Sequence, residues 1–255
     1  DFLPRLSNHD EPSGGPMIRL EHLQKRYGTL QAVDDLCLEV PSGELFCFLG
    51  PNGAGKTTSI KMMTGLVKPD AGSICLAGVD AMKEPVRARS QLGYIPDMPF
   101  LYERLTPMEF LLFTGDLYKM PREEVREKAP RMLEIFGMMD RAHTLNRDLS
   151  HGMRQRVIYA ATLMHEPKVL LVDEPFIGLD PHSIRLIKDL LREHTQRGMT
   201  VLMTTHILAI AEEIGDRIGI IDQGRLVACG TLAELNEATP GMGKLEDLFL
   251  KVTLH

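Results

Sequence analysis

The strongest constraint on this chain is a glycine-rich loop with the sequence GPNGAGKT at residues 50–57. The loop follows a short apolar run, precedes a segment of helical character and matches the pattern GxxxxGK[ST] in full. Glycines allow a backbone to wrap a phosphate chain with its N–H groups pointing inward, and a helix N-terminus adds positive potential. The loop therefore predicts a nucleotide site in which Lys56 reaches the β- and γ-phosphates and the Thr57 hydroxyl binds Mg²⁺.

Strands and helices alternate along the rest of the sequence. Apolar or alternating runs predict strands at residues 18–23, 32–40, 45–49, 73–76, 92–95, 169–172, 200–203 and 218–221. Helices are predicted at residues 56–66, 181–194 and 207–214, and apolar residues at helical spacing fill residues 106–165, where Pro121 begins a new helix. Strands separated by helices of this length predict a parallel, doubly wound sheet, into which the helical block is inserted.

A second motif is a pair of acids at the end of an apolar run, VLLVDE at residues 169–174. Ligands of such sheets bind at the carboxyl ends of the strands. Asp173 suits Mg²⁺, which prefers oxygen ligands, and Glu174 is placed to orient and deprotonate an attacking water. Alone, the pattern would indicate only a salt bridge at a strand end, but downstream of a P-loop it favours these two roles.

A third motif, LSHGMRQR at residues 149–156, opens the helix that leads to the acidic strand. Ser150 is a good N-cap residue for that helix. An uncapped helix start binds phosphate just as readily, so the residues alone support a capping role and an anion-binding role about equally.

Composition limits the possible functions. The 255 residues carry a net charge of −6, with 44% hydrophobic and 25% charged residues, which excludes a disordered or collagen-like chain. This balance disfavours a strongly basic nucleic-acid binder, and nine Phe, five Tyr and no Trp disfavour base stacking as the main activity. The four cysteines show no metal-type spacing and are expected to be small buried residues of a protein in a reducing compartment: Cys37, Cys47, Cys75 and Cys229.

A membrane-spanning segment is not expected. The longest stretch without Asp, Glu, Lys or Arg covers the 14 residues 198–211, whereas a spanning helix needs roughly 20 mostly apolar residues. Residues 1–16 are polar and rich in Pro and Gly, and they lack the apolar core of a signal peptide. We expect them to be a tail or a cloning remnant, with the true start upstream of Asp1, and we expect a soluble protein.

The order of these motifs, followed by His206 after two threonines, resembles the ATP-binding-cassette (ABC) ATPases, the nucleotide-binding subunits of membrane transporters. The resemblance extends from about residue 17 to the end of the chain. It implies an α/β fold: a P-loop NTPase (RecA-like) core with a mainly parallel sheet, an N-terminal antiparallel β subdomain and an inserted α-helical subdomain. It also implies ATP and Mg²⁺ as cofactors.

The resemblance further implies a single ATPase domain at residues 17–255. Its nucleotide-binding core would comprise residues 17–97 and 166–230. The helical subdomain with the signature loop would comprise residues 98–165, and a short helical tail would comprise residues 231–255.

Individual roles follow from the same resemblance. It implies ATP contacts from Tyr27, Asn52, Gly53, Ala54, Gly55, Lys56, Thr57, Thr58, Ser150, Gly152 and Asp180. It implies catalytic roles for Glu174, His206 and Lys56, and Mg²⁺ ligands at Thr57, Asp97 and Asp173. Tyr27 would stack on adenine, Ser150 and Gly152 would touch the γ-phosphate of ATP bound to the opposite subunit, and Asp180 would lie in a loop that connects the two sites. Without the resemblance, Tyr27 would be interpreted as packing and His206 as an ordinary residue after a strand.

Two positions depart from the family pattern. The signature is usually LSGGQ, whereas this chain has His151 and Met153 at the variable positions and keeps Ser150 and Gly152. The family's Gln that senses Mg²⁺ and the attacking water is replaced by Asp97. Asp97 either binds the metal at an electrostatic cost or serves mainly as a hinge.

The implied function is ATP-driven dimerisation that powers transport through a separate transmembrane permease, at the cytoplasmic face of the cell membrane. The second ATP-binding subunit would be another copy or a different chain, and no nucleic-acid partner is expected. The short tail and residues 94–96 and 101–102 resemble subunits of multidrug and antibiotic exporters. A soluble ABC-type ATPase acting on DNA or ribosomes is the alternative, although the single P-loop and the lack of long heptad runs disfavour it. A small-metabolite kinase would leave residues 150–156 and Asp180 unexplained.

Overall fold

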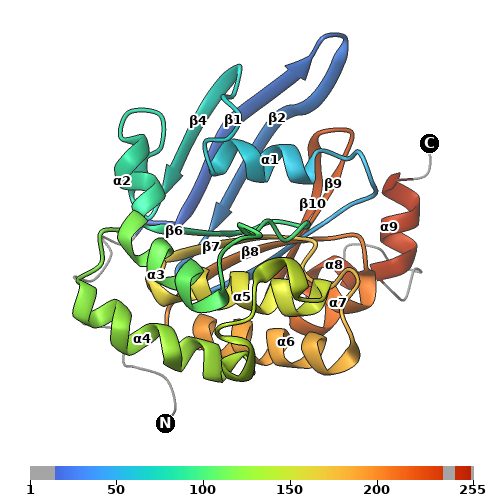
Figure 1. Cartoon of the computed structure of the whole chain (residues 1–255). Coiled ribbons are helices and arrows are strands. Elements are labelled where there is room, and N and C mark those ends of the chain that lie inside the picture. Colours follow the sequence, from blue (N-terminus) through green and yellow to red (C-terminus); the bar gives the residue numbers. More distant parts are fainter. Residues whose placement is uncertain (1–14, 238–244, 254–255) are drawn as a thin grey trace.

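Two β-sheets stacked on opposite sides of a helix form the upper half of the molecule in Figure 1. The computed structural model describes residues 15–237 and 245–253. Most of the expected N-terminal tail, and residues 238–244 and 254–255 of the expected C-terminal tail, lie outside the described residues. The smaller sheet is antiparallel, in the order β2 (Leu30–Val40), β1 (Ile18–Tyr27), β4 (Ala71–Leu76) and β5 (Val79–Asp80).

The larger sheet has six strands in the order β10 (Arg225–Gly230), β9 (Arg217–Asp222), β3 (Leu45–Leu49), β8 (Thr200–Thr205), β7 (Val169–Asp173) and β6 (Leu92–Ile95). All neighbours are parallel except β10, which returns antiparallel to β9. Every residue of β3, β7 and β8 is buried, as expected for a parallel sheet covered on both faces.

Each strand of the larger sheet divides its side chains between two cores. On β3, Phe46 and Phe48 join the core shared with the antiparallel sheet and with α1 (Lys56–Met63). Leu45, Cys47 and Leu49 alternate with these two residues and point to the opposite core, among the helices on the far face. Figure 1 shows α1 between the two sheets and the other long helices below the larger sheet. The P-loop therefore lies where β3 leaves the sheet and enters α1.

The helices of the far face include the inserted block. The helices of the inserted block are α3 (Pro107–Leu117), α4 (Arg122–Ile135) and α5 (His151–Met164), with 3-10 turns at Met139–Arg141 and Asn146–Asp148. The same face also carries α6 (Pro181–Gln196) and α7 (Leu208–Ile214). Shorter helices are α2 (Pro85–Ser90), α8 (Leu232–Glu237) and α9 (Leu245–Thr253). A capping box of Thr106 and Glu109 begins α3, and Pro121 is the N-cap of α4. The predicted helical insertion is confirmed.

The predicted fold class is confirmed, and all eight predicted strands are present. Strands β5 and β10 and helix α2 were not predicted, because β5 has two residues and β10 is a partly exposed edge strand. The expectation that all four cysteines are buried is wrong. Only Cys47 is buried, while Cys37 and Cys229 are exposed and Cys75 is half-buried. Among residues 15–237 and 245–253, no helix is long and apolar enough to cross a membrane.

Candidate active site

The P-loop backbone passes so close to two other strands of the protein that glycine is required at two positions. A Cβ at Gly50 would lie 2.4 Å from the carbonyl oxygen of Ile221. Gly55 has a φ of 109°, and a Cβ there would lie 2.5 Å from the carbonyl oxygen of Ala32. Strand β9 and strand β2 thus hold the loop against the start of α1, with its backbone in the conformation that suits phosphate binding.

Lys56 is the first residue of α1, and its side chain is only 6% exposed. Its Nζ donates to the carbonyl oxygens of Gly50, at 2.7 Å, and Pro51, at 3.1 Å, and lies 3.5 Å from Glu174 Oε1. Burial lowers the pKa of Lys56 below its usual range, while the Glu174 carboxylate acts in the opposite direction. The ammonium is thus held inside the loop that would surround the phosphates.

Asp173 is the last residue of β7, and only one of its two carboxylate oxygens accepts hydrogen bonds. Its Oδ1 accepts hydrogen bonds from Thr204 Oγ1 at 2.5 Å and Thr57 Oγ1 at 3.3 Å. Its Oδ2 is buried and has no hydrogen-bond partner among the described residues. Burial raises the pKa of Asp173, the two hydrogen bonds oppose that rise, and the negative charges of Asp97 and Glu174 add to it. An unpartnered buried carboxylate oxygen beside a P-loop hydroxyl fits a hard cation such as Mg²⁺.

Glu174 directly follows β7 with a left-handed φ of 47°. Its backbone N–H donates to Thr204 Oγ1 at 3.0 Å, and its Oε2 accepts from His206 Nδ1 at 2.9 Å. The other oxygen, Oε1, is the one near Lys56. The Glu174 carboxylate is therefore held between the Lys56 ammonium and the His206 ring, and the Glu174 side chain is 12% exposed. A non-glycine residue in this backbone region is a strained feature of the kind found at functional sites.

Asp97 lies just beyond the end of β6, the strand next to β7. Its side chain is exposed, and its Oδ1 accepts from the backbone N–H of Met98 at 2.8 Å. The negative charge of Asp97 raises the pKa of Asp173, so the two carboxylates interact electrostatically. The structure thus places Asp97 just past the end of the strand that neighbours β7, where its charge acts on Asp173.

The signature loop and residues 178–181 meet at a second location. Ser150 Oγ accepts from the backbone N–H of Met153 at 3.3 Å, so its predicted capping role in α5 is confirmed. A Cβ on Gly152 would lie 3.9 Å from Asp180 Oδ2. Asp180 caps α6 through two hydrogen bonds from Ser183, which hold the pKa of its carboxyl below the usual range. In the described part of the chain, no side-chain hydrogen bond or ion pair links these residues to Lys56.

Tyr27 ends β1 at the tip of the β1–β2 hairpin. Its side chain is 46% exposed, and the ammonium of Lys25 lies 5.5 Å from the ring centroid. An exposed ring face at the end of a strand is available for stacking on another flat group.

Thr204 was missed by sequence reasoning, although it contacts both acids of the site. It faces Asp173 across the β7–β8 ladder, where its hydroxyl donates to Asp173 and accepts from the Glu174 backbone. Its side chain therefore fixes the relative position of the two acids. Its place directly before Thr205 and His206, at the end of an apolar strand, was the available signal.

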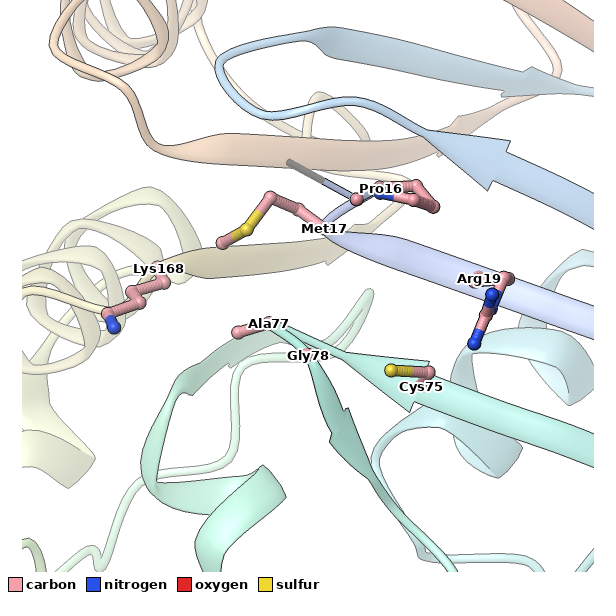
Figure 2. Close-up of a pocket in the computed structure, with 8 residues that line it drawn as sticks. Pro16, Met17, Arg19, Cys75, Ala77, Gly78 and Lys168 are labelled. Atoms are coloured by element: carbon pink, nitrogen blue, oxygen red, sulfur yellow. The ribbon is translucent and has the colours of Figure 1, made fainter. Parts of the chain in front are cut away.

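The cavity in Figure 2 is separate from this site. It has a volume of about 200 Å³ and is lined by residues at the start of β1, at the β4–β5 turn and just before β7, including Met17, Ala77 and Lys168. Lys168 precedes the amino end of β7, whereas Asp173 lies at the carboxyl end of the same strand. The cavity is also smaller than typical small-molecule pockets, which measure roughly 300–1,000 Å³.

Comparison with known proteins identifies the family. The sequence profile described as "ABC transporter" matches residues 33–177, which include the P-loop, the signature loop and the acidic strand. The chain belongs to the ABC transporter family. It is an ATP-binding subunit of that family, and such subunits are ATPases coupled to transport.

Several curated ABC proteins are similar to this chain over most of its length. The linearmycin resistance ATP-binding protein LnrL of Bacillus subtilis (strain 168) is 39% identical over 86% of this chain and 70% of its own length. The Nod factor export ATP-binding protein I of Ralstonia nicotianae is 40% identical over 86% of this chain and 68% of its own. The daunorubicin resistance ATP-binding protein DrrA3 of Streptomyces coeruleorubidus is 39% identical over 88% and 71%.

Solved structures of ABC subunits also match this fold. A structure of an ATP-binding subunit of an ABC transporter is 33% identical with a TM-score of 0.87, over 92% of this chain and 99% of that chain. The structure of cbiO1 from Clostridium perfringens, part of the ABC transporter complex cbiONQ, is 26% identical with a TM-score of 0.75, over 91% and 99%. The ABC resemblance inferred from the motifs is confirmed, and with it ATP as the nucleotide.

Proposed function

We propose that this ABC subunit hydrolyses ATP with Mg²⁺ at a site completed by a second ATP-binding subunit, and that it powers export through a separate permease. The observation that carries the chemistry is the contact series at the carboxyl edge of the larger sheet. There Lys56 faces Glu174, Glu174 contacts His206, and Thr57 contacts Asp173.

The residues at this edge fit ATP and Mg²⁺. The P-loop residues Asn52, Gly53, Ala54, Gly55, Lys56, Thr57 and Thr58 would surround the phosphates. Thr57 Oγ1 and the unpartnered Oδ2 of Asp173 would hold Mg²⁺, with Asp97 as a further oxygen donor. When bound, Mg²⁺ supplies positive charge that neutralises the β- and γ-phosphate oxygens.

Glu174 would orient the attacking water and accept its proton. Because His206 and Lys56 each contact one oxygen of this carboxylate, its orientation is set before the nucleotide arrives. Lys56 would then stabilise the charge on the transferred phosphoryl group, and His206 would contact the γ-phosphate. Tyr27 would stack on the adenine ring, which its exposed face permits.

The ATP bound by the second subunit would be contacted by Ser150 and Gly152, and Asp180 would lie in the loop that connects the two ATP sites. These three residues adjoin one another and have no side-chain hydrogen bond or ion pair to Lys56 in residues 15–237 and 245–253, which supports a role at a neighbouring subunit. Ser150 and His151 at the start of α5 are exposed, so a phosphate of another subunit would reach the backbone N–H groups there that the Ser150 cap leaves free. ATP would then join two subunits, and hydrolysis would separate them.

An aromatic patch beside Asp97 would contact the permease. It consists of Phe100, Tyr102 and Phe113, which are 75%, 50% and 37% exposed. The ring centroids of Phe100 and Tyr102 are 6.0 Å apart, and those of Tyr102 and Phe113 are 5.5 Å apart. Exposed clustered aromatic side chains are typical of protein interfaces. Because Phe100 and Tyr102 lie in the segment that follows Asp97, between β6 and α3, movement at the patch would reach the metal site.

Replacing Phe100 with Ser should release the subunit from membranes that contain its permease. Loss of a central aromatic contact costs about 2 kcal/mol or more, which corresponds to roughly 30-fold weaker binding. The measurement is the membrane-bound fraction after sedimentation of host membranes. Val86→Ser on α2 is the matched control, because Val86 is 74% exposed outside the patch. Equal membrane-bound fractions for Phe100→Ser and the wild type would contradict the docking role of the patch.

Replacing Asp97 with Asn tests whether this residue holds the metal. Loss of a charged oxygen donor should raise the Mg²⁺ concentration for half-maximal ATPase activity by about tenfold. Asp116→Asn on α3 is the control, since Asp116 is an exposed carboxylate of the helical block and is not among the proposed metal ligands. An unchanged Mg²⁺ dependence in Asp97→Asn would assign Asp97 to a hinge instead.

The subunit would drive export from a peripheral position at the cytoplasmic face of the membrane. The relatives carry names that refer to linearmycin resistance, daunorubicin resistance and Nod factor export. A peripheral position agrees with the lack of a spanning helix among the described residues. The cargo would be chosen by the permease.

A further inference from the structure

A cluster of three metal-binding side chains lies on the antiparallel sheet, outside the ATPase site. His22 from β1 and Asp35 and Cys37 from β2 place one nitrogen, one oxygen and one sulfur within 4.8 Å of one another. The distance from His22 Nδ1 is 2.8 Å to Asp35 Oδ1 and 3.7 Å to Cys37 Sγ. All three residues are exposed.

Two compensating bulges bring these side chains together. Between the pairs Leu20↔Leu38 and Leu23↔Leu36, strand β1 has one residue more than β2, and His22 lies in that bulge. Between the pairs Leu23↔Leu36 and Lys25↔Val33, strand β2 has one residue more than β1, and Asp35 lies in that second bulge. The bulges give His22 a φ of 50° and Asp35 a φ of 55°. Bulges redirect side chains, so that both now face the thiol of Cys37.

We propose that His22, Asp35 and Cys37 form a binding site for a divalent transition-metal ion of the Zn²⁺ type. Imidazole nitrogen, thiolate sulfur and carboxylate oxygen are the ligands that Zn²⁺ takes, and three protein ligands leave a fourth position for water. Binding requires the Cys37 thiol to lose its proton and the His22 ring to be neutral with its proton on Nε2, so that Nδ1 offers a lone pair. The resulting ligand set carries two negative charges, which match the charge of the ion.

The geometry favours a metal site over a nucleophilic thiol. In a catalytic Cys–His–Asp arrangement, the thiol and the carboxylate bind opposite nitrogens of the imidazole ring. Here Asp35 and Cys37 both face Nδ1 of His22, so the ring cannot pass a proton from one to the other. Convergence of three donor atoms on one point is instead what an ion requires.

The surroundings also favour a cation. A groove at the cluster is lined by Leu20, Glu21, His22, Cys37, Leu38 and Glu39. Glu21 and Glu39 add negative charge at its two sides and attract cations to the groove. Arg19 Nε lies 3.6 Å from Glu21 Oε1 and partly neutralises that carboxylate.

Titration of the untagged, nucleotide-free chain with Co²⁺ tests the site independently of ATPase activity. Co²⁺ reports on a thiolate ligand through a charge-transfer absorption band. We expect this band at one Co²⁺ per chain and its loss when Zn²⁺ is added, since Zn²⁺ binds such sites more tightly. Cys37→Ser should abolish the band, and His22→Ala should weaken Co²⁺ binding at least about tenfold.

Cys229→Ser is the matched control, because Cys229 is an exposed thiol on β10 that contacts Arg217 instead of a histidine. It should leave the band and the affinity unchanged. No band in the wild-type chain, or an equal band in Cys37→Ser, would overturn the proposal. Thermal unfolding of each variant shows whether a loss of binding reflects loss of the fold.

Discussion

Glu174→Gln lowers the rate of ATP hydrolysis by about 10²–10⁴-fold, the range that a positioned general base contributes. The amide keeps the shape of the side chain but cannot accept the proton of the attacking water. It also keeps an oxygen that can contact Lys56 or His206, so ATP binding should persist. The measurement is phosphate release at saturating ATP and Mg²⁺, with nucleotide binding measured by calorimetry on the same variant.

Glu212→Gln provides the control for this variant. Glu212 is an exposed glutamate on α7, the helix that follows His206, and it lies outside the proposed catalytic contacts. Its replacement should leave the hydrolysis rate unchanged. If Glu174→Gln hydrolysed ATP within twofold of the wild-type rate, Glu174 would not be the base, and the water would have to be activated by another group.

Lys56→Met weakens ATP binding by about 30-fold to 4,000-fold, because a buried charged contact to the phosphates is lost at a cost of roughly 2–5 kcal/mol. Methionine retains an apolar stem inside the loop but removes the ammonium that now binds Gly50 and Pro51. It also leaves Glu174 without its cationic neighbour, which adds repulsion toward the triphosphate. Calorimetric titration with ATP gives the change in dissociation constant.

Lys61→Ala separates this effect from a general change in helix α1. Lys61 lies on the same helix, is exposed and belongs to its last turn. Its loss should change ATP affinity by less than about twofold, since the charge of an exposed residue is well screened. Equal affinities for Lys56→Met and the wild type would remove Lys56 from the phosphate site.

The sequence was most informative where burial and backbone geometry leave local signals. The predicted strand at residues 45–49 coincides with β3, because five buried apolar residues end at a glycine that no larger residue can replace. The strand at residues 92–95 coincides with β6. Since parallel strands end at one edge, the meeting of Lys56 with Glu174 was also foreseeable. The roles of these residues in catalysis stay predictions.

Features that depend on pairing between distant segments could not be predicted. The contact of Thr204 with Asp173 arises from the β7–β8 register. The exposure of Cys37 is a different case, because the alternation that predicts the strand at residues 32–40 also turns Leu36 and Leu38 inward and Cys37 outward. The expectation that Cys37 is buried overlooked this local signal. The bulge at His22 adds a residue to one strand and leaves no periodic signal in the sequence. For the same reason, a search for metal sites by cysteine spacing misses the cluster at Cys37.

Purification of the tagged chain from membranes of its native host, in mild detergent and with quantitative mass spectrometry, tests the proposed role most directly. We expect a stoichiometric partner with several membrane spans and two ATP-binding subunits in each complex. Recovery from the cytosol alone, with ribosomes, with DNA or without any partner, would contradict a role in export and favour a soluble ABC-type ATPase.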